Sequence, residues 1–226
     1  METKTARSKK SIVGGVGIND ANYVTQKTEV IDEYYPSGRR KTRQVWICPY
    51  YRKWTAMLER CYSKSFHEKA PSYRNCFVCE EWLTFSNFSS WMKGQDWKDK
   101  HLDKDYLVRG NKMYSPTTCV FLCKIVNDFI KDRVASRGNC LLGCHLDTRD
   151  EIFISYCNNP FKRDGDQRKN ELGSFDFEVD AHLAWKYAKH TYAVELANSE
   201  YVTDDRIKDI LLSRYQNYTV VEVHLK

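Results

Sequence analysis

Apolar residues recur at two different spacings along the chain, and the changes between them mark the expected elements. In the stretch 102–127, LDKDYLVRGNKMYSPTTCVFLCKIVN, an apolar run with alternating polar positions meets the turn signal Gly110-Asn111. A second apolar run covers 119–122, and apolar positions at helical spacing follow over 123–133. The pattern predicts strand, loop, strand and helix, a ββα unit whose helix packs over the hairpin.

Helical spacing of aromatic and other apolar residues predicts two more helices before this unit, over 50–62 and 85–92. We expect them to support the ββα unit with their aromatic stripes in the core, although such a stripe could also stack bases. Further upstream, 24–35 and 43–47 are expected to pair as a hairpin with its tip at 36–42.

After a polar link at 135–139, the pattern predicts three strands and a long helix, then a short helix and a final strand. These elements are expected over 141–146, 151–156, 172–175, 179–197, 204–215 and 219–225. The predicted fold class is therefore α+β, with a three-stranded sheet packed on one helix behind the ββα unit. Four segments are expected: a basic tail with a hairpin (1–48), the ββα domain (49–135), the sheet domain (136–202) and a terminal helix with a strand (203–226).

Composition narrows the class of protein. The 226 residues include six Trp and are 42% hydrophobic, which indicates a folded chain. No stretch is apolar enough to span a bilayer, and the start, METKTARSKK, lacks the apolar core of a signal peptide. We therefore expect a soluble intracellular protein without a membrane partner. The net charge of +6 favours a polyanionic partner.

The ββα unit carries a candidate metal site. Asp103 on its first strand and Asn127 on its helix can approach each other from opposite sides. A carboxylate and an amide oxygen facing one gap suit Mg²⁺, which prefers oxygen ligands. Strand alternation would place Asp105 on the same face as Asp103 and suggests a joint role. Alternatively, Asp103, Lys104 and Asp105 form a surface array of ion pairs.

The nine cysteines, an odd number, are expected to be reduced thiols or metal ligands and not a disulfide framework. Cys76 and Cys79 form a C-x-x-C pair that Cys61 and Cys119 could complete as a structural Zn²⁺ site. The alternative is that these cysteines replace apolar residues in the core.

Basic residues gather at two places where they could contact phosphates. Arg39, Arg40, Lys41 and Arg43 lie on the expected hairpin tip, a plausible grip on a DNA backbone, with an ordinary soluble loop as the alternative. In the sheet domain the basic candidates are Arg149, Lys162, Arg163, Arg168 and Lys169.

The middle of the chain resembles a known family. The residues that carry the resemblance are Leu102-Asp-Lys-Asp105, Gly110-Asn111, Tyr114-Ser-Pro116, Cys119 and Asn127, with Trp54, Met57, Arg60-Cys-Tyr62, Tyr73, Val78-Cys-Glu-Glu-Trp82, Phe85, Phe88 and Trp91 upstream. In order and spacing they are similar to the HNH-like nuclease core of bacteriophage homing endonucleases. The resemblance implies an HNH-like ββα-metal nuclease core that hydrolyses phosphodiester bonds of double-stranded DNA with Mg²⁺, in the cytoplasm of a bacterial host cell.

The chain departs from this family at the general base. HNH nucleases usually carry a histidine where this chain has Lys104. A protonated lysine can hold a phosphate but is a poor base. Asp105 or His101 could replace the base, or the metal alone could activate the water. A catalytically silent DNA-binding repressor derived from such a nuclease would also explain the lysine, and a zinc-stabilised interaction protein without a nucleic-acid role is a third possibility.

The sheet domain resembles the plant ethylene-response-factor (AP-two) DNA-binding domain through Leu142-Gly143, Leu172-Gly-Ser-Phe175, Ala181, Ala184, Trp185 and Ala188. In that family the sheet enters the major groove with the helix behind it. The family's first strand is rich in arginine, whereas this chain has Gly143-Cys-His-Leu-Asp147. Backbone contacts are therefore favoured over base readout, and an α+β packing module is the alternative. The sequence leaves the oligomeric state and the target site open.

Overall fold

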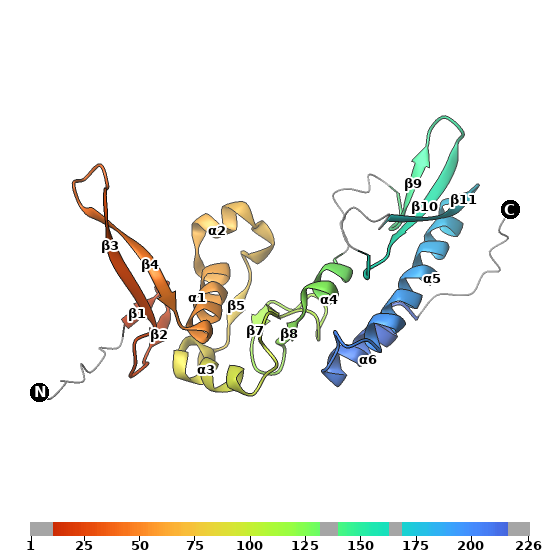
Figure 1. Ribbon diagram of the computed structural model, residues 1–226. Coiled ribbons are helices and arrows are strands. Elements are labelled where there is room, and N and C mark those ends of the chain that lie inside the picture. Colours follow the sequence, from red (N-terminus) through yellow and green to blue (C-terminus); the bar gives the residue numbers. More distant parts are fainter. Residues whose placement is uncertain (1–10, 132–139, 163–168, 217–226) are drawn as a thin grey trace, which may run out of the picture. The chain divides into compact units, whose positions relative to one another are not determined.

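The computed structural model describes residues 11–131, 140–162 and 169–216, and it confirms the α+β class (Figure 1). The chain divides into two compact units. The first unit comprises residues up to 98 together with 102–121, and the second comprises 99–101 and the chain from 122 onward. Among the described residues, no helix is long and apolar enough to cross a membrane.

The first unit opens with two hairpins and continues with three helices. The hairpins are β1 (Ser11–Val13) with β2 (Gly17–Asn19), and β3 (Gln26–Tyr34) with β4 (Arg40–Ile47). The helices are α1 (Pro49–Tyr62), α2 (Lys64–Lys69) and α3 (Phe85–Lys93), with short 3₁₀ turns η1 (Pro71–Tyr73) and η2 (Glu80–Leu83). The predicted hairpin and both predicted support helices are thus confirmed. The second strand begins at Arg40 and not at 43, so Arg40, Lys41 and Arg43 lie on β4 and not on an exposed tip loop.

Aromatic side chains form the core of the first unit. Trp54 and Met57 of α1 are fully buried, and so is Phe88 of α3. The indole N–H of Trp54 donates to the carbonyl of Trp82 at 2.7 Å, so this buried donor is satisfied. The aromatic stripes therefore belong mainly to the core, as predicted, with Trp91 half-buried at its edge.

Short strands close the first unit. β5 (Phe77–Val78) pairs in parallel with β7 (Met113–Tyr114), and β6 (His101–Asp103) pairs with β8 (Val120–Leu122). β6 ends at Asp103, so the predicted strand does not continue to Asp105.

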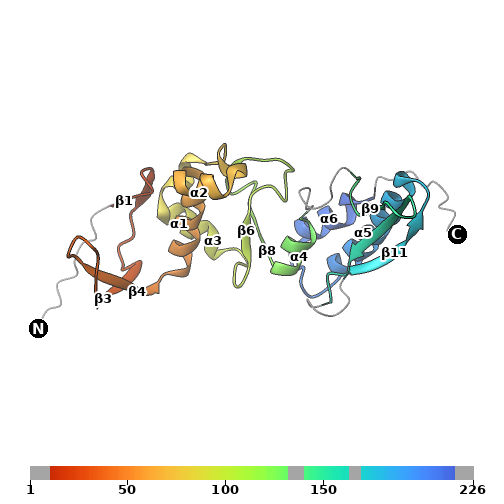
Figure 2. The ribbon, with the colours of Figure 1, turned by 90° about the horizontal axis from the view of Figure 1, so that it is seen from above.

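The second unit is a three-stranded antiparallel sheet with one long helix, as predicted (Figure 2). Its strands are β9 (Cys144–Asp147), β10 (Ile152–Asn158) and β11 (Lys169–Phe175) in the order β11-β10-β9, and its helices are α4 (Lys124–Phe129), α5 (Glu178–Ala197) and α6 (Asp205–Arg214). The hydroxyl of Ser155 donates to the carbonyl of Ala181 at 2.7 Å, and both residues are fully buried. The small residue at 181 lets α5 lie close on β10.

Two close contacts explain local features of the second unit. Gly143 has φ +85°, and a Cβ there would lie 1.9 Å from Cγ of Trp185, so β9 starts only after this turn and not at 141. The amino group of Lys189, buried on α5, donates to the carbonyl of Phe129 and lies 3.8 Å from the centroid of its ring. It caps the last turn of α4.

Some predicted elements reach beyond the described residues. α4 ends at Phe129, earlier than the predicted 133, and its predicted end falls outside the described part of the chain. The link at 135–139 and the strand at 219–225 lie outside it as well.

Candidate active site

A small polar pocket beside β6 contains three of the four predicted catalytic residues. Its volume is about 120 Å³. The lining residues are Ser72, Tyr73, Leu102, Asp103, Lys104, Asp105, Lys112 and Tyr114. All of them belong to the first unit, so their arrangement is defined within one compact body.

Asp103 organises the chain at this pocket. Its Oδ1 accepts the backbone N–H of Asp105 at 2.9 Å and that of Tyr106 at 2.7 Å, which ends β6 in an Asx turn. Burial raises the pKa of Asp103, and the neighbouring charge of Asp105 raises it further. Both turn bonds end on one carboxylate oxygen, and the two carboxyl groups interact with each other.

Asp105 reaches this position for a different reason from the predicted one. The prediction that strand alternation sets Asp103 and Asp105 on one face is wrong, because the strand ends at Asp103 and Asp105 lies in the turn. The turn itself brings the two carboxyl groups together. The pairing of two acids expected from the sequence is therefore present through a different backbone geometry.

Lys104 lies inside the protein. Only 6% of the residue is exposed, and its Nζ donates to Oδ2 of Asp105 and to the carbonyl of Asn111, each at 3.1 Å. Burial alone would lower the pKa of Lys104, but Asp105 outweighs it and the pKa is raised. Lys104 is therefore a cation at neutral pH. The Lys104–Asp105 ion pair is also one of the contacts expected if Asp103, Lys104 and Asp105 form an array of ion pairs.

Asn111 ties the returning loop to the turn. Its Nδ2 donates to the carbonyls of Lys104 at 2.7 Å and Met113 at 2.6 Å, and its Oδ1 accepts the N–H of Met113 at 3.2 Å. Thr118 donates a further bond to the Met113 carbonyl at 2.8 Å. This set of bonds, the Asn111 clasp, fixes the Lys104 carbonyl to the backbone of Met113.

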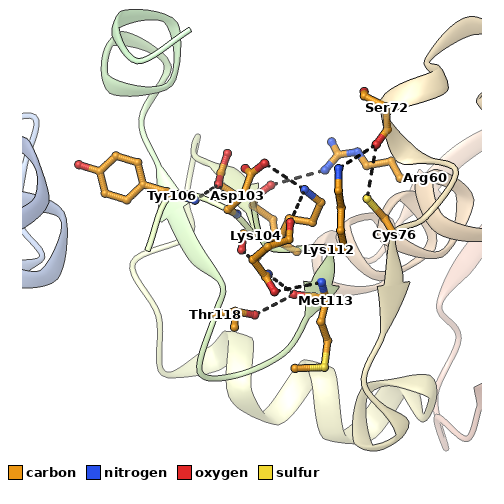
Figure 3. A network of polar contacts seen from close by, with 12 residues as sticks. Arg60, Ser72, Cys76, Asp103, Lys104, Tyr106, Lys112, Met113 and Thr118 are labelled. Atoms are coloured by element: carbon orange, nitrogen blue, oxygen red, sulfur yellow. Dashed lines mark hydrogen bonds and ion pairs between the residues drawn. The ribbon is translucent and has the colours of Figure 1, made fainter. Parts of the chain in front are cut away.

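Two cations near the pocket were not among the predicted site residues. Figure 3 shows Arg60 and Lys112 beside Lys104 and Asp103. Nη1 of Arg60 donates to the Leu102 carbonyl at 3.5 Å. Burial would lower the pKa of Arg60, but Tyr114 and other neighbours, including Asp103, outweigh burial and raise this pKa. Lys112 is exposed and its Nζ donates to the Ser72 carbonyl at 3.4 Å. The family-like pattern around Arg60 and the position of Lys112 after the Gly-Asn turn were the available signals.

The remaining candidates for the metal and the base lie in the second unit. Asn127 is half-buried on α4, with its backbone N–H bonded to Cys123 in the first turn of the helix. His101 is exposed at the start of β6. Asn127 belongs to the second unit and Asp103 to the first, so the approach of Asn127 to Asp103 stays a prediction.

The four cysteines proposed for zinc are largely core residues. Cys61, Cys76 and Cys119 are buried, and burial raises the pKa of both Cys61 and Cys119 to about 12. In the described part of the chain, no three His, Cys, Asp or Glu side chains gather where they could hold a metal ion. These observations favour the core interpretation, and the zinc site stays an untested prediction.

The predicted DNA-contacting residues differ in their surroundings. On the hairpin, Arg43 pairs with Glu29 and Lys41 pairs with Glu33. In the second unit, Arg149 pairs with Asp147 at 3.5 Å, Lys162 is exposed, and Nζ of Lys169 lies 3.6 Å from the ring centroid of Tyr156. Arg163 and Arg168 lie outside the described residues.

Comparison of the chain with protein-family models, curated proteins and solved structures finds no match.

Proposed function

We propose that this chain is a metal-dependent DNA endonuclease of the HNH-like type that hydrolyses phosphodiester bonds in double-stranded DNA. The observation that supports the proposal best is the Asx turn at Asp103, which brings two carboxyl groups to one polar pocket beside three cationic side chains. Carboxylate oxygens are the donors that Mg²⁺ prefers. Cations beside them suit a phosphate that must approach acidic groups.

In this proposal Asp103 and Asn127 hold the metal, and Asp105 is a further ligand or the base. The bound metal would stabilise negative charge on the phosphate and lower the pKa of a bound water. Lys112, exposed at the pocket, is the cation best placed to meet an incoming phosphate. Lys104 can act as a phosphate clamp only if it exchanges its bond to Asp105 for one to the phosphate.

A catalytically silent DNA-binding repressor is the second candidate, and one specific observation favours it. Lys104 is protonated, and the described lining of the pocket contains no imidazole that could act as a base. A repressor needs no base and would bind DNA equally well with Mg²⁺ or with chelator.

The test uses supercoiled plasmid carrying the flanking genomic DNA of the gene, incubated with the purified protein in Mg²⁺ or in chelator. Asp103→Asn is the informative variant, because an amide oxygen can keep the Asx turn while the charge is lost. Asp209→Asn, at an exposed carboxylate of α6, is the matched control. We expect Mg²⁺-dependent nicked or linear product from the wild type and the control, and none from Asp103→Asn.

Gel shifts of the same DNA in chelator separate binding from cleavage. Cleavage that persists in Asp103→Asn would exclude the proposed metal ligand. Intact plasmid together with a gel shift that is indifferent to Mg²⁺ would favour the repressor.

A further inference from the structure

The hairpin of β3 and β4, residues 26–47 and called the β3–β4 ribbon here, is exposed on both faces. Eight of the nine residues of β3 are exposed and the ninth is half-buried. The ribbon pairs with no third strand among the described residues. An isolated two-stranded hairpin is marginally stable in water, so a ribbon of this length is expected to gain stability from a partner.

The charges of the ribbon indicate the kind of partner. It carries five cations, Lys27, Arg39, Arg40, Lys41 and Arg43, against three carboxylates, Glu29, Asp32 and Glu33. Four of the five cations lie within the five residues 39–43, called the tip here, which comprise the end of the turn and the first half of β4. Such a tip suits a polyanion, and the major groove of DNA, about 12 Å wide, admits a two-stranded ribbon. At about 3.3 Å per residue, the strands reach roughly 26–30 Å, enough to extend along the groove.

Each cation of the tip already has a partner on the ribbon. Lys41 pairs with Glu33 at 2.9 Å, and Arg43 pairs with Glu29. Nε of Arg40 donates to the hydroxyl of Tyr34 at 3.0 Å, and the guanidinium of Arg39 lies 5.5 Å from the ring centroid of Tyr35. These partners hold the cations in place, but only the two glutamates neutralise charge.

We propose that the β3–β4 ribbon is an arm that enters the major groove of duplex DNA, and that Glu29 and Glu33 occupy two of its phosphate-binding cations until DNA displaces them. This inference rests on DNA as the partner in the proposed function. Exposed ion pairs contribute little to stability, so a phosphate can replace the carboxylate at small cost. The two glutamates would then lower affinity for any DNA that the ribbon does not fit well.

If the ribbon binds DNA in this way, removing acidic residues far from the pocket tightens DNA binding through the ribbon alone. An ordinary charged hairpin without a DNA-binding role would not show this effect. Glu29→Gln/Glu33→Gln frees two cations, so DNA no longer has to displace a carboxylate from either of them. We expect about tenfold tighter duplex binding at 0.1 M salt.

The measurement is fluorescence anisotropy of a labelled duplex with the full chain, titrated in chelator at several salt concentrations. Glu195→Gln/Glu200→Gln removes the same charge from exposed positions of the second unit and is the matched control. Arg39→Gln/Arg40→Gln is expected to weaken binding about tenfold or more, and circular dichroism confirms folding of each variant.

Three results would overturn the inference: equal tightening by the control pair, unchanged or weaker binding by Glu29→Gln/Glu33→Gln, and equal binding of single-stranded and duplex DNA. Because the assay contains no metal, failure of catalysis does not affect it. A wild-type protein that does not bind duplex would overturn both this inference and the proposed function.

Discussion

The Asn111 clasp provides a sharp test of how the pocket is held together. Asn111→Ala removes three hydrogen bonds, to the Lys104 carbonyl and to both backbone groups of Met113. At about 0.5–1.5 kcal/mol net for each bond, the expected loss is about 2–4 kcal/mol in the free energy of unfolding. Because the same bonds fix the backbone next to Asp103, DNA cleavage is expected to fall as well, even at temperatures where the variant is folded.

Thr118→Val tests the second side chain that donates to the Met113 carbonyl. It removes the hydroxyl bond to the Met113 carbonyl and one to Ser115, for an expected loss of about 1–2 kcal/mol. In each single variant the Met113 carbonyl keeps one donor, whereas the double variant takes both away. The double variant is therefore expected to lose at least about 0.5 kcal/mol more than the sum of the single losses.

Urea unfolding followed by tryptophan fluorescence measures all four proteins. A loss below about 1 kcal/mol in Asn111→Ala would refute the reasoning. Strict additivity in the double variant would show that the two side chains do not share the Met113 carbonyl.

Three further perturbations probe other parts of the chain. Asp103→Asn is expected to raise the melting temperature at neutral pH. Burial and Asp105 raise the pKa of Asp103 in the folded protein, so the protonated carboxyl group stabilises the fold at pH values below the unfolded pKa. This stabilisation is lost as the pH rises through the folded pKa, whereas the neutral amide of the variant has no charge to bury. Thermal melts from pH 3 to 8 should show this advantage closing in acid, and a constant difference would contradict it. Gly143→Ala adds a Cβ against Trp185 at a left-handed φ and should cost about 2–5 kcal/mol in urea unfolding, whereas a loss below 1 kcal/mol would disprove the contact. Lys189→Met removes the charged cap on the Phe129 carbonyl and should cost about 1.5–3 kcal/mol, and an equally stable variant would show that the cap contributes nothing.

Periodicity predicted the elements well wherever one face of an element is buried. The helix over 50–62 is α1, whose apolar stripe is the core of the first unit. The three strands and the long helix of the second unit were also expected, since the sheet and α5 each bury one face. In these segments the local pattern and the tertiary packing agree.

The arrangement of the site was less predictable, because it depends on bonds between residues several positions apart. Alternation assigned Asp105 to a strand, but the Asx turn of Asp103 ends that strand. The sequence predicted that Lys104 holds a phosphate or, alternatively, belongs to a surface array of ion pairs, whereas Asp105 and the Asn111 carbonyl hold it inside the protein. The hairpin shows the same effect, since Lys41 and Arg43 of β4 pair with carboxylates of β3.

The burial of Lys104 changes what its presence implies about catalysis. A lysine at the position of a catalytic histidine suggests a phosphate clamp if it is exposed, but this amino group is already bonded to a carboxylate and a carbonyl. Its charge therefore acts first on Asp105, whose negative charge it offsets beside Asp103. Removing that charge should make it harder to ionise Asp103, since the pKa of Asp103 is already raised by the like charge of Asp105. Lys104→Met is thus expected to shift the acid limb of the pH–cleavage profile upward, whereas a lysine that only clamps phosphate would lower the rate equally at every pH.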